Sequence, residues 1–162
     1  MIKNNYINIY NNIVNLTRNK KLYSKITNND TFSDRLIIFL FHFAFLLKVF
    51  KNKEKKSIIQ KVFDSTFKQL ELSIRELGYG DMSINKKMKE YVNLFYAILD
   101  KIENWENLEK DEKMKILHKF LSSNSQNFLL YEDLSIYFEK YRIFLSNITL
   151  NLLIKSVIKE KF

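Results

Sequence analysis

Apolar side chains recur at steps of three and four residues along most of this sequence. A helix with one buried face has this spacing, whereas a half-buried strand alternates apolar and polar residues. The clearest series lies between about Lys53 and Leu77 and consists of Ile59, Phe63, Phe67, Leu70, Ile74 and Leu77. A second series consists of Ile84, Met88, Tyr91, Phe95, Ile98 and Ile102. No segment shows a convincing strand pattern, so the sequence predicts an all-α fold.

About six to seven helices are expected, in a single compact domain that spans residues 1–162. The expected helices lie at about 6–18, 32–50, 53–77, 82–102, 111–121, 130–144 and 148–159. Thr31 and Asp34 form a capping box before the second of these helices, with Asp30 as the alternative cap. No internal repeat or interdomain linker interrupts the pattern, and a chain of this length can bury a core as one domain.

The chain has only two glycines, Gly78 and Gly80, and no proline. Gly78 directly follows the helix expected to end at Leu77, at a position where a residue in left-handed conformation often ends a helix. Gly80 then allows a second turn, and Asp81 or Ser83 can cap the next helix. We therefore expect a tight Gly-x-Gly-Asp corner between two long helices, packed against each other.

Three lysines follow this corner, Lys86, Lys87 and Lys89, in the first two turns of the next helix. Cations at a helix N-terminus oppose the helix dipole, so acidic residues would be the default there. The lysines either reflect a lysine-rich composition or form a binding patch beside the corner.

The net charge of +9 is concentrated in residues 1–80, which carry 14 basic and 6 acidic side chains. Five lysines surround Glu54 in this half: Lys48, Lys51, Lys53, Lys55 and Lys56. Such a run either faces water at a helix start or meets an RNA backbone or an anionic lipid surface. Four of the 27 basic residues are arginine, which argues against base-specific readout. The alternative function is thus a basic helical adaptor for ribosomal RNA or an anionic membrane.

Motifs for catalysis and for metal or cofactor binding are missing from the sequence. It has no cysteine and two histidines, His42 and His118, which is too few for a zinc cluster. It also lacks a glycine-rich phosphate loop and a nucleophile elbow. We therefore expect no enzyme and no cofactor, and the lack of cysteine is typical of a reducing compartment.

The most apolar run, Leu36–Leu47, has 12 residues with His42 inside it, whereas a membrane span needs about 20. It is better explained as a helix buried on most faces. His42 is then either a hydrogen-bonded core residue or, in the alternative, a haem ligand.

The segment from Phe63 to Tyr96 resembles the signature of the ubiquinol–cytochrome c chaperone family. Matching positions are Arg75, Glu76, Leu77, Gly78, Gly80, Asp81, Lys86, Met88, Lys89, Phe95 and Tyr96. Upstream, the matching positions include Asp30, Thr31, Arg35 and His42. The resemblance is strongest over 9–96 and loose over 97–141, and it leaves the helix expected at 148–160 unassigned. Ala97-Ile98 departs from the glycine-arginine pair that is usual in the family.

The resemblance implies an all-α assembly factor that is not an enzyme. In this family the client is newly made cytochrome b, and the setting is assembly of the cytochrome bc1 complex, respiratory complex III. It also implies a small partner subunit and contact with the ribosomal exit region. The chain length resembles the short bacterial form, which implies the bacterial cytoplasm or the cytoplasmic face of the inner membrane, or the matrix side if organellar.

Individual side chains can be placed from the pattern as well. Phe95 continues the buried series, so we expect it inside and Tyr96 at the rim. Arg75 follows Glu71 by four residues, which favours an ion pair on one helix face. We also expect Arg75 to tie the corner to another helix through Asp30 or Asp34. The aromatic stripe is either core or a surface for an apolar client.

Overall fold

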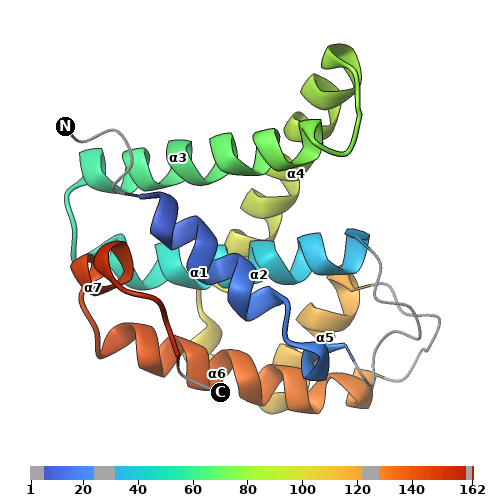
Figure 1. Cartoon of the computed structure of the whole chain (residues 1–162). Coiled ribbons are helices and arrows are strands. Elements are labelled where there is room, and N and C mark those ends of the chain that lie inside the picture. The colour runs from blue at the N-terminus through green and yellow to red at the C-terminus, as the bar shows by residue number, and fades with distance from the viewer. Residues whose placement is uncertain (1–5, 24–31, 122–127, 160–161) are drawn as a thin grey trace.

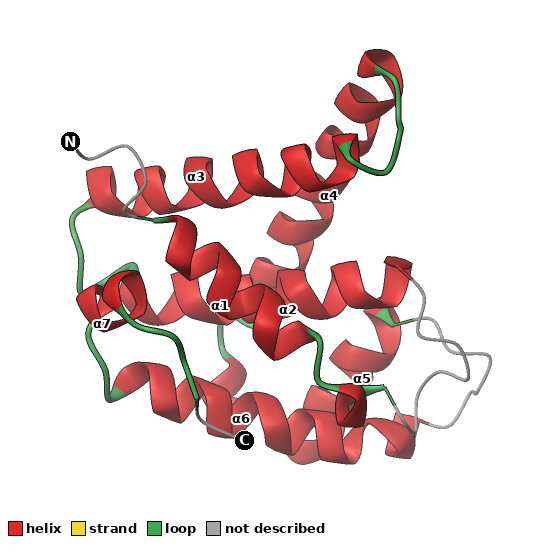
Figure 2. Cartoon of the chain, viewed as in Figure 1, coloured by secondary structure: helices red, strands yellow, loops and turns green. Residues whose placement is uncertain are grey.

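The computed structural model describes residues 6–23, 32–121, 128–159 and 162, and these contain seven α-helices and no strand (Figures 1 and 2). The helices are α1 (Ile7–Thr17), α2 (Phe32–Phe50), α3 (Lys56–Arg75), α4 (Asp81–Lys101), α5 (Lys110–Phe120), α6 (Glu132–Ser146) and α7 (Leu150–Lys155). Three short 3-10 turns accompany them: η1 (Lys20–Leu22), η2 (Trp105–Asn107) and η3 (Phe128–Tyr131). The prediction of a single all-α domain is confirmed.

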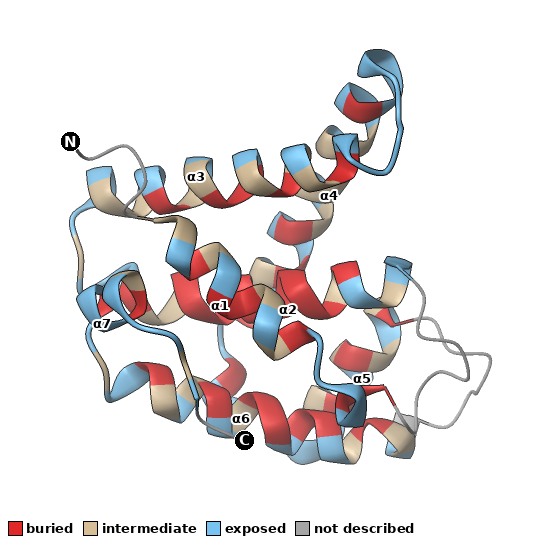
Figure 3. Cartoon of the chain, viewed as in Figure 1, coloured by how far each residue is buried: buried red, intermediate tan, exposed pale blue. Residues whose placement is uncertain are grey.

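The centre of the fold is α2, the helix that carries the most apolar run. Phe41, Phe43, Ala44 and Phe45 are consecutive or nearly so and all have no exposed surface. They are covered on several sides because α1, α4 and α6 all contact α2. Figure 3 shows buried residues along much of the visible part of this helix. The run is therefore a core helix, and no helix in the described part of the chain has the length and apolar character of a membrane span.

The other helices form layers on either side of α2. In Figure 1, α3 runs along one side of α2 and α6 along the other. α1 crosses α2 and also contacts α3 and α7, while α5 packs on α6 and η3. The connected ends of α3 and α4 project beyond the remaining helices (Figure 1).

The last helix, α7, is shorter than the expected 148–159, because the side chain of Asn12 on α1 forms hydrogen bonds with the backbone at the end of α7 and just after it. The amide nitrogen of Asn12 donates to the carbonyl oxygens of Leu153 and Ser156, at 3.1 and 2.9 Å. Its amide oxygen accepts from the backbone N–H of Ile158 at 2.9 Å. Residues 156–159 therefore run along α1 without helical structure.

Candidate functional site

The connection between α3 and α4 holds both glycines of the chain. Gly78 has φ +95°, and it is the one described residue with a positive φ. Gly80 has φ −74° and ψ 162°, which any residue can adopt, and a Cβ on either glycine would meet nothing within 4 Å. Gly78 is thus required by its backbone conformation. No side chain caps α4, because its N-cap is Gly80, so the expected cap by Asp81 or Ser83 is wrong.

Arg75 links the end of α3 to the beginning of α4. Its guanidinium bonds Glu71 at 3.0 Å, which confirms the expected pair within the helix, and it also bonds Asp81. The hydrogen bonds from Asp81 and Glu71 raise the pKa of Arg75. The second partner is therefore Asp81 rather than Asp34, and Asp30 lies outside the described residues.

We call residues 76–89 the α3–α4 tip. Three apolar side chains of the tip face water: Leu77 is 58% exposed, Tyr79 42% and Met82 88%. The apolar series predicts Leu77 on the buried face of its helix. However, α3 ends at Arg75, two residues earlier, so Leu77 is not part of the helix and does not lie on its buried face. Glu76, Lys86 and Lys89 are exposed as well, whereas Met88 is partly buried against the core.

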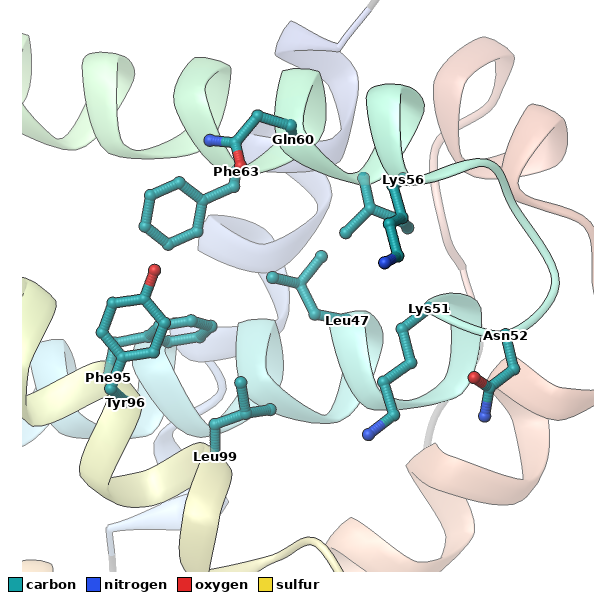
Figure 4. A pocket seen from close by; sticks show the side chains of 10 residues that line it. Leu47, Lys51, Asn52, Lys56, Gln60, Phe63, Phe95, Tyr96 and Leu99 are labelled. Carbon is teal, nitrogen blue, oxygen red and sulfur yellow. The ribbon is translucent and has the colours of Figure 1, made fainter.

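A groove opens on the molecule where the C-terminal end of α2 meets α3 and α4 (Figure 4). Its volume is about 510 Å³. Ten residues line it: Leu47, Lys51, Asn52, Lys56, Ile59, Gln60, Phe63, Phe95, Tyr96 and Leu99. We call it the apolar groove, because its walls are mostly aliphatic and aromatic and its polar groups come from four side chains and the tyrosine hydroxyl.

The aromatic wall of the groove is built on the buried ring cluster of the core. Phe95 is fully buried and Tyr96 is 53% exposed, as expected. Phe63 stacks on Tyr96 with ring centroids 5.9 Å apart and also contacts Phe95 at 5.8 Å. Phe43 holds Phe95 from α2, at 5.2 Å. The exposed ring of Tyr96 is therefore supported from behind rather than free to move.

The groove brings together residues from two features that lie far apart in the sequence. Phe95 and Tyr96 come from the motif on α4, while Lys51 and Lys56 come from the lysine run. In Figure 4 the amino groups of both lysines lie at one side of the groove, opposite the aromatic wall. The sequence analysis did not identify Asn52, Gln60 or Leu99 as site residues. Of these three, only Leu99 has a signal in the sequence, which is its position in the helical register of α4.

The lysine run is not a uniform cationic surface. Lys48 pairs with Glu106 at 3.0 Å and Lys51 with Glu103 at 2.7 Å. Lys53 donates to the carbonyl oxygen of Ser146 at 2.9 Å. Burial alone would raise the pKa of Glu106, but hydrogen bonds, including that from Lys48, and nearby positive charge lower it overall. Lys55 and Lys56 are exposed, with no carboxylate partner among the described residues.

His42 is a core residue with both ring nitrogens occupied. Its Nδ1 lies 2.8 Å from the carbonyl oxygen of Ile38, and its Nε2 lies 2.6 Å from the hydroxyl of Tyr137. Since a carbonyl only accepts, Nδ1–H donates to Ile38 and Nε2 accepts from Tyr137. Burial lowers the pKa of His42 to about 4, so the ring is neutral. His42 thus bonds within the core, as expected, and its ring nitrogens are not free for haem.

Of the remaining predicted positions, only Arg35 falls within the described residues, and it lines neither the groove nor the tip. Arg35 is exposed near the start of α2, and Asp30 and Thr31 lie outside the described residues. Within the described ranges, no group of three or more His, Cys, Asp or Glu side chains is placed to hold a metal ion.

Comparison with known families gives a match to the model described as "Ubiquinol-cytochrome C chaperone" over residues 24–124, more than half of the chain. The chain belongs to the ubiquinol–cytochrome c chaperone family. The matched region includes α2, α3 and α4, and hence both the groove and the tip. Family membership assigns the chain to the chaperones of bc1 complex assembly.

A solved structure supports the fold of this chaperone-family chain. The crystal structure of the Cbp3 homolog from Brucella abortus superimposes with a TM-score of 0.72 at 22% sequence identity. The match covers 93% of this chain and 84% of the Brucella chain. A search of curated proteins gives no match.

Proposed function

We propose that this chain is a non-enzymatic assembly factor that binds newly made cytochrome b in the apolar groove. The observation that supports this proposal is the groove itself, in which a half-exposed tyrosine and aliphatic walls face water beside two lysines. A transmembrane subunit exposes apolar helices before assembly, and such helices need an apolar surface to cover them.

The dimensions favour part of a helix as the occupant. A groove of about 510 Å³ falls within the range of small-ligand pockets and holds a few side chains rather than a whole helix. A client helix would place two or three apolar residues, spaced by three or four, against Tyr96, Phe63 and Leu47. Tyr96 is suited to anchor this contact because aromatic rings that are rigidly held lose little entropy on binding.

Lys56 favours one orientation of the client helix. Its amino group lies at the edge of the groove without a carboxylate partner among the described residues, whereas the charge of Lys51 is offset by Glu103. A cation stabilises the negative C-terminal end of a helix, or a carboxylate near it. We therefore infer that the client helix ends, or carries an acidic residue, beside Lys56.

We further propose that residues 76–81 act as a fixed corner that holds α4 relative to α3. The positive φ of Gly78 and the bond from Arg75 to Asp81 support this proposal. Family membership also leads us to propose a small partner subunit and a site of action near the ribosomal exit, at the membrane face where cytochrome b is made. The ion pairs of Lys48 and Lys51 argue against the alternative of an adaptor that binds RNA through the lysine run.

Site-specific photo-crosslinking in the native host tests the proposal. A photoreactive phenylalanine analogue at Tyr96 should form a covalent adduct with cytochrome b, identified by mass spectrometry. The matched control is the same analogue at Ile136, which is 43% exposed on α6, on the other side of α2 from α3 (Figure 1). Adducts at both positions, or at neither, would contradict a groove that binds cytochrome b.

A charge reversal provides the second test. Lys56→Glu should weaken recovery of cytochrome b, whereas Lys55→Glu, one residue earlier and outside the groove lining, should leave it unchanged. If cells that lack the chain still assemble a normal bc1 complex, the proposed function is wrong.

A further inference from the structure

The projecting α3–α4 tip exposes more apolar side chain than a water-facing loop needs. Met82, at 88%, is the most exposed large apolar residue among those described, and Leu77 is 58% exposed. Tyr79 adds an aromatic ring that is 42% exposed. The three lie close together in the chain at the end that projects from the molecule (Figures 1 and 3). A cluster of this kind marks a surface that meets another phase or another molecule.

Three lysines follow these apolar residues along α4. Met82, Lys86 and Lys89 are spaced by four and three residues, so they share one face of α4. The amino group of Lys87 lies 4.7 Å above the ring of Tyr79. None of these three lysines has a carboxylate partner among the described residues, and Asp81 is bonded to Arg75. The remaining carboxylate of the tip is Glu76. The charges of the tip that are not in an ion pair are therefore three positive and one negative, so this surface is positive.

The spacing along α4 fits the layers of a bilayer surface. At about 1.5 Å per residue, Lys86 lies about 6 Å and Lys89 about 10 Å behind Met82 along the helix axis. The headgroup layer on each side of a bilayer is about 6 Å thick, from the difference between its total and hydrocarbon thickness. With α4 upright on the bilayer and Met82 at the hydrocarbon boundary, the backbone of Lys86 lies at the outer edge of this layer and that of Lys89 about 4 Å outside it, so both long side chains can reach back to the phosphates.

We propose that the α3–α4 tip is a membrane-contact site for a bilayer that contains anionic phospholipids. Leu77, Tyr79 and Met82 enter the interface, while Lys86, Lys87 and Lys89 contact the lipid phosphates. The position of the tip favours lipid, because the connected ends of α3 and α4 project beyond the remaining helices and can meet a flat bilayer first (Figure 1). A Cβ on Gly78 or Gly80 would meet nothing within 4 Å, so no other part of the chain covers the backbone at these two positions. Contact with lipid phosphates also explains lysines placed against the helix dipole.

The site differs from the lysine run and from the apolar groove. Lys48 and Lys51 are held by Glu106 and Glu103, so they are less available to lipid than the lysines of the tip. Along α3, the end of the helix at Arg75 lies about 18 Å from the groove residue Phe63, because twelve residues separate them. Membrane contact at the tip therefore does not depend on what the groove binds.

Flotation of the full chain with vesicles tests the proposal. Binding to vesicles of phosphatidylcholine and phosphatidylglycerol should exceed binding to phosphatidylcholine alone, and added salt should weaken it. Met82→Gln should lower partitioning by about tenfold, from the loss of one buried apolar side chain. Lys86→Glu with Lys89→Glu should lower it by about 25-fold or more on the anionic vesicles, at about fivefold or more for each lysine.

Matched variants elsewhere serve as controls. Val157→Gln replaces an apolar residue that is 63% exposed and lies outside the tip. Lys140→Glu with Lys155→Glu reverses the charge of two exposed lysines on α6 and α7. These variants should retain wild-type binding, apart from a weak uniform effect of net charge. In a separate variant, Tyr79→Trp, the new fluorophore should shift to the blue on anionic vesicles, while the buried Trp105 gives a constant background.

Three results would overturn the proposal. The first is a wild-type chain that does not bind anionic vesicles. The second is equal loss of binding in the tip variants and in their controls. The third is a Met82→Gln variant that binds vesicles normally but no longer co-purifies with a protein partner of the wild type, which would make the tip a protein-docking surface. Loss of cytochrome b crosslinking at Tyr96 with intact vesicle binding would contradict the groove proposal alone.

Discussion

The buried histidine predicts a specific dependence of stability on pH. His42 has no exposed surface, and burial lowers its pKa from 6.5 to about 4 in the folded chain. The unfolded chain therefore binds a proton at this ring more readily than the folded chain does between pH 4 and 6.5. Folding stability consequently rises with pH across this window, and the contribution of His42 is lost as the pH falls.

The size of the effect follows from the two pKa values. Linkage gives a loss of about 2 kcal/mol between pH 7 and pH 5, and of about 3 kcal/mol by pH 4. His42→Gln removes the titrating group, so this variant should lose about 2 kcal/mol less than the wild type between pH 7 and pH 5. All other groups are the same in both chains, so their contributions cancel in the difference.

Urea unfolding at a series of pH values measures the prediction. Trp105 is the single tryptophan and is fully buried, so its fluorescence reports loss of the core. Tyr137→Phe is the matched control, because it removes the bond to Nε2 and keeps the buried ring. It should cost about 1–3 kcal/mol at pH 7 and retain the pH slope. Equal slopes in the wild type and in His42→Gln would refute the reasoning.

Four further variants test the fold and the tip. Gly78→Ala should lower stability by about 1–2 kcal/mol because of the positive φ, whereas Gly80→Ala should have little effect; equal losses in thermal unfolding would contradict this. Asn12→Ala should cost about 1–3 kcal/mol and speed hydrogen exchange at the amide of Ile158, and unchanged exchange would count against the capture of residues 156–159. Phe95→Ala should cost about 3–5 kcal/mol in urea unfolding, because the ring has no exposed surface, and a loss below about 1 kcal/mol would show that the ring cluster is not packed as described.

The sequence predicted the helices well where local signals were strong. The apolar run of α2 fixed a core helix at 32–50, and the structure has Phe32–Phe50. The prediction failed where a distant residue decides the outcome. Asn12 ends α7 early from more than 140 residues away, and no local pattern near Ser156 or Ile158 indicates this.

The same reason explains what the sequence missed in the candidate site. Lysines at 48 and 51 looked like a cationic surface because their partners, Glu106 and Glu103, lie more than 50 residues further on. The apolar groove needs three helices to form, so spacing within one helix indicates only its individual walls. Tyr96 was placed correctly at a rim, but the sequence did not indicate the groove beside that rim.

The ring cluster at the base of α4 separates the two proposed surfaces. Phe95 is held by Phe43, Phe63 and Phe67, with centroids 5.2–5.8 Å apart, and this cluster fixes α4 on α2 and α3. At the tip, the side chains of Leu77 and Met82 face water and contribute little to this packing. The ion pairs of Arg75 are exposed, and exposed pairs stabilise a fold only weakly. Substitutions at the tip should therefore alter the surface that meets a membrane and leave the shape of the groove unchanged, so the two proposals can be tested independently.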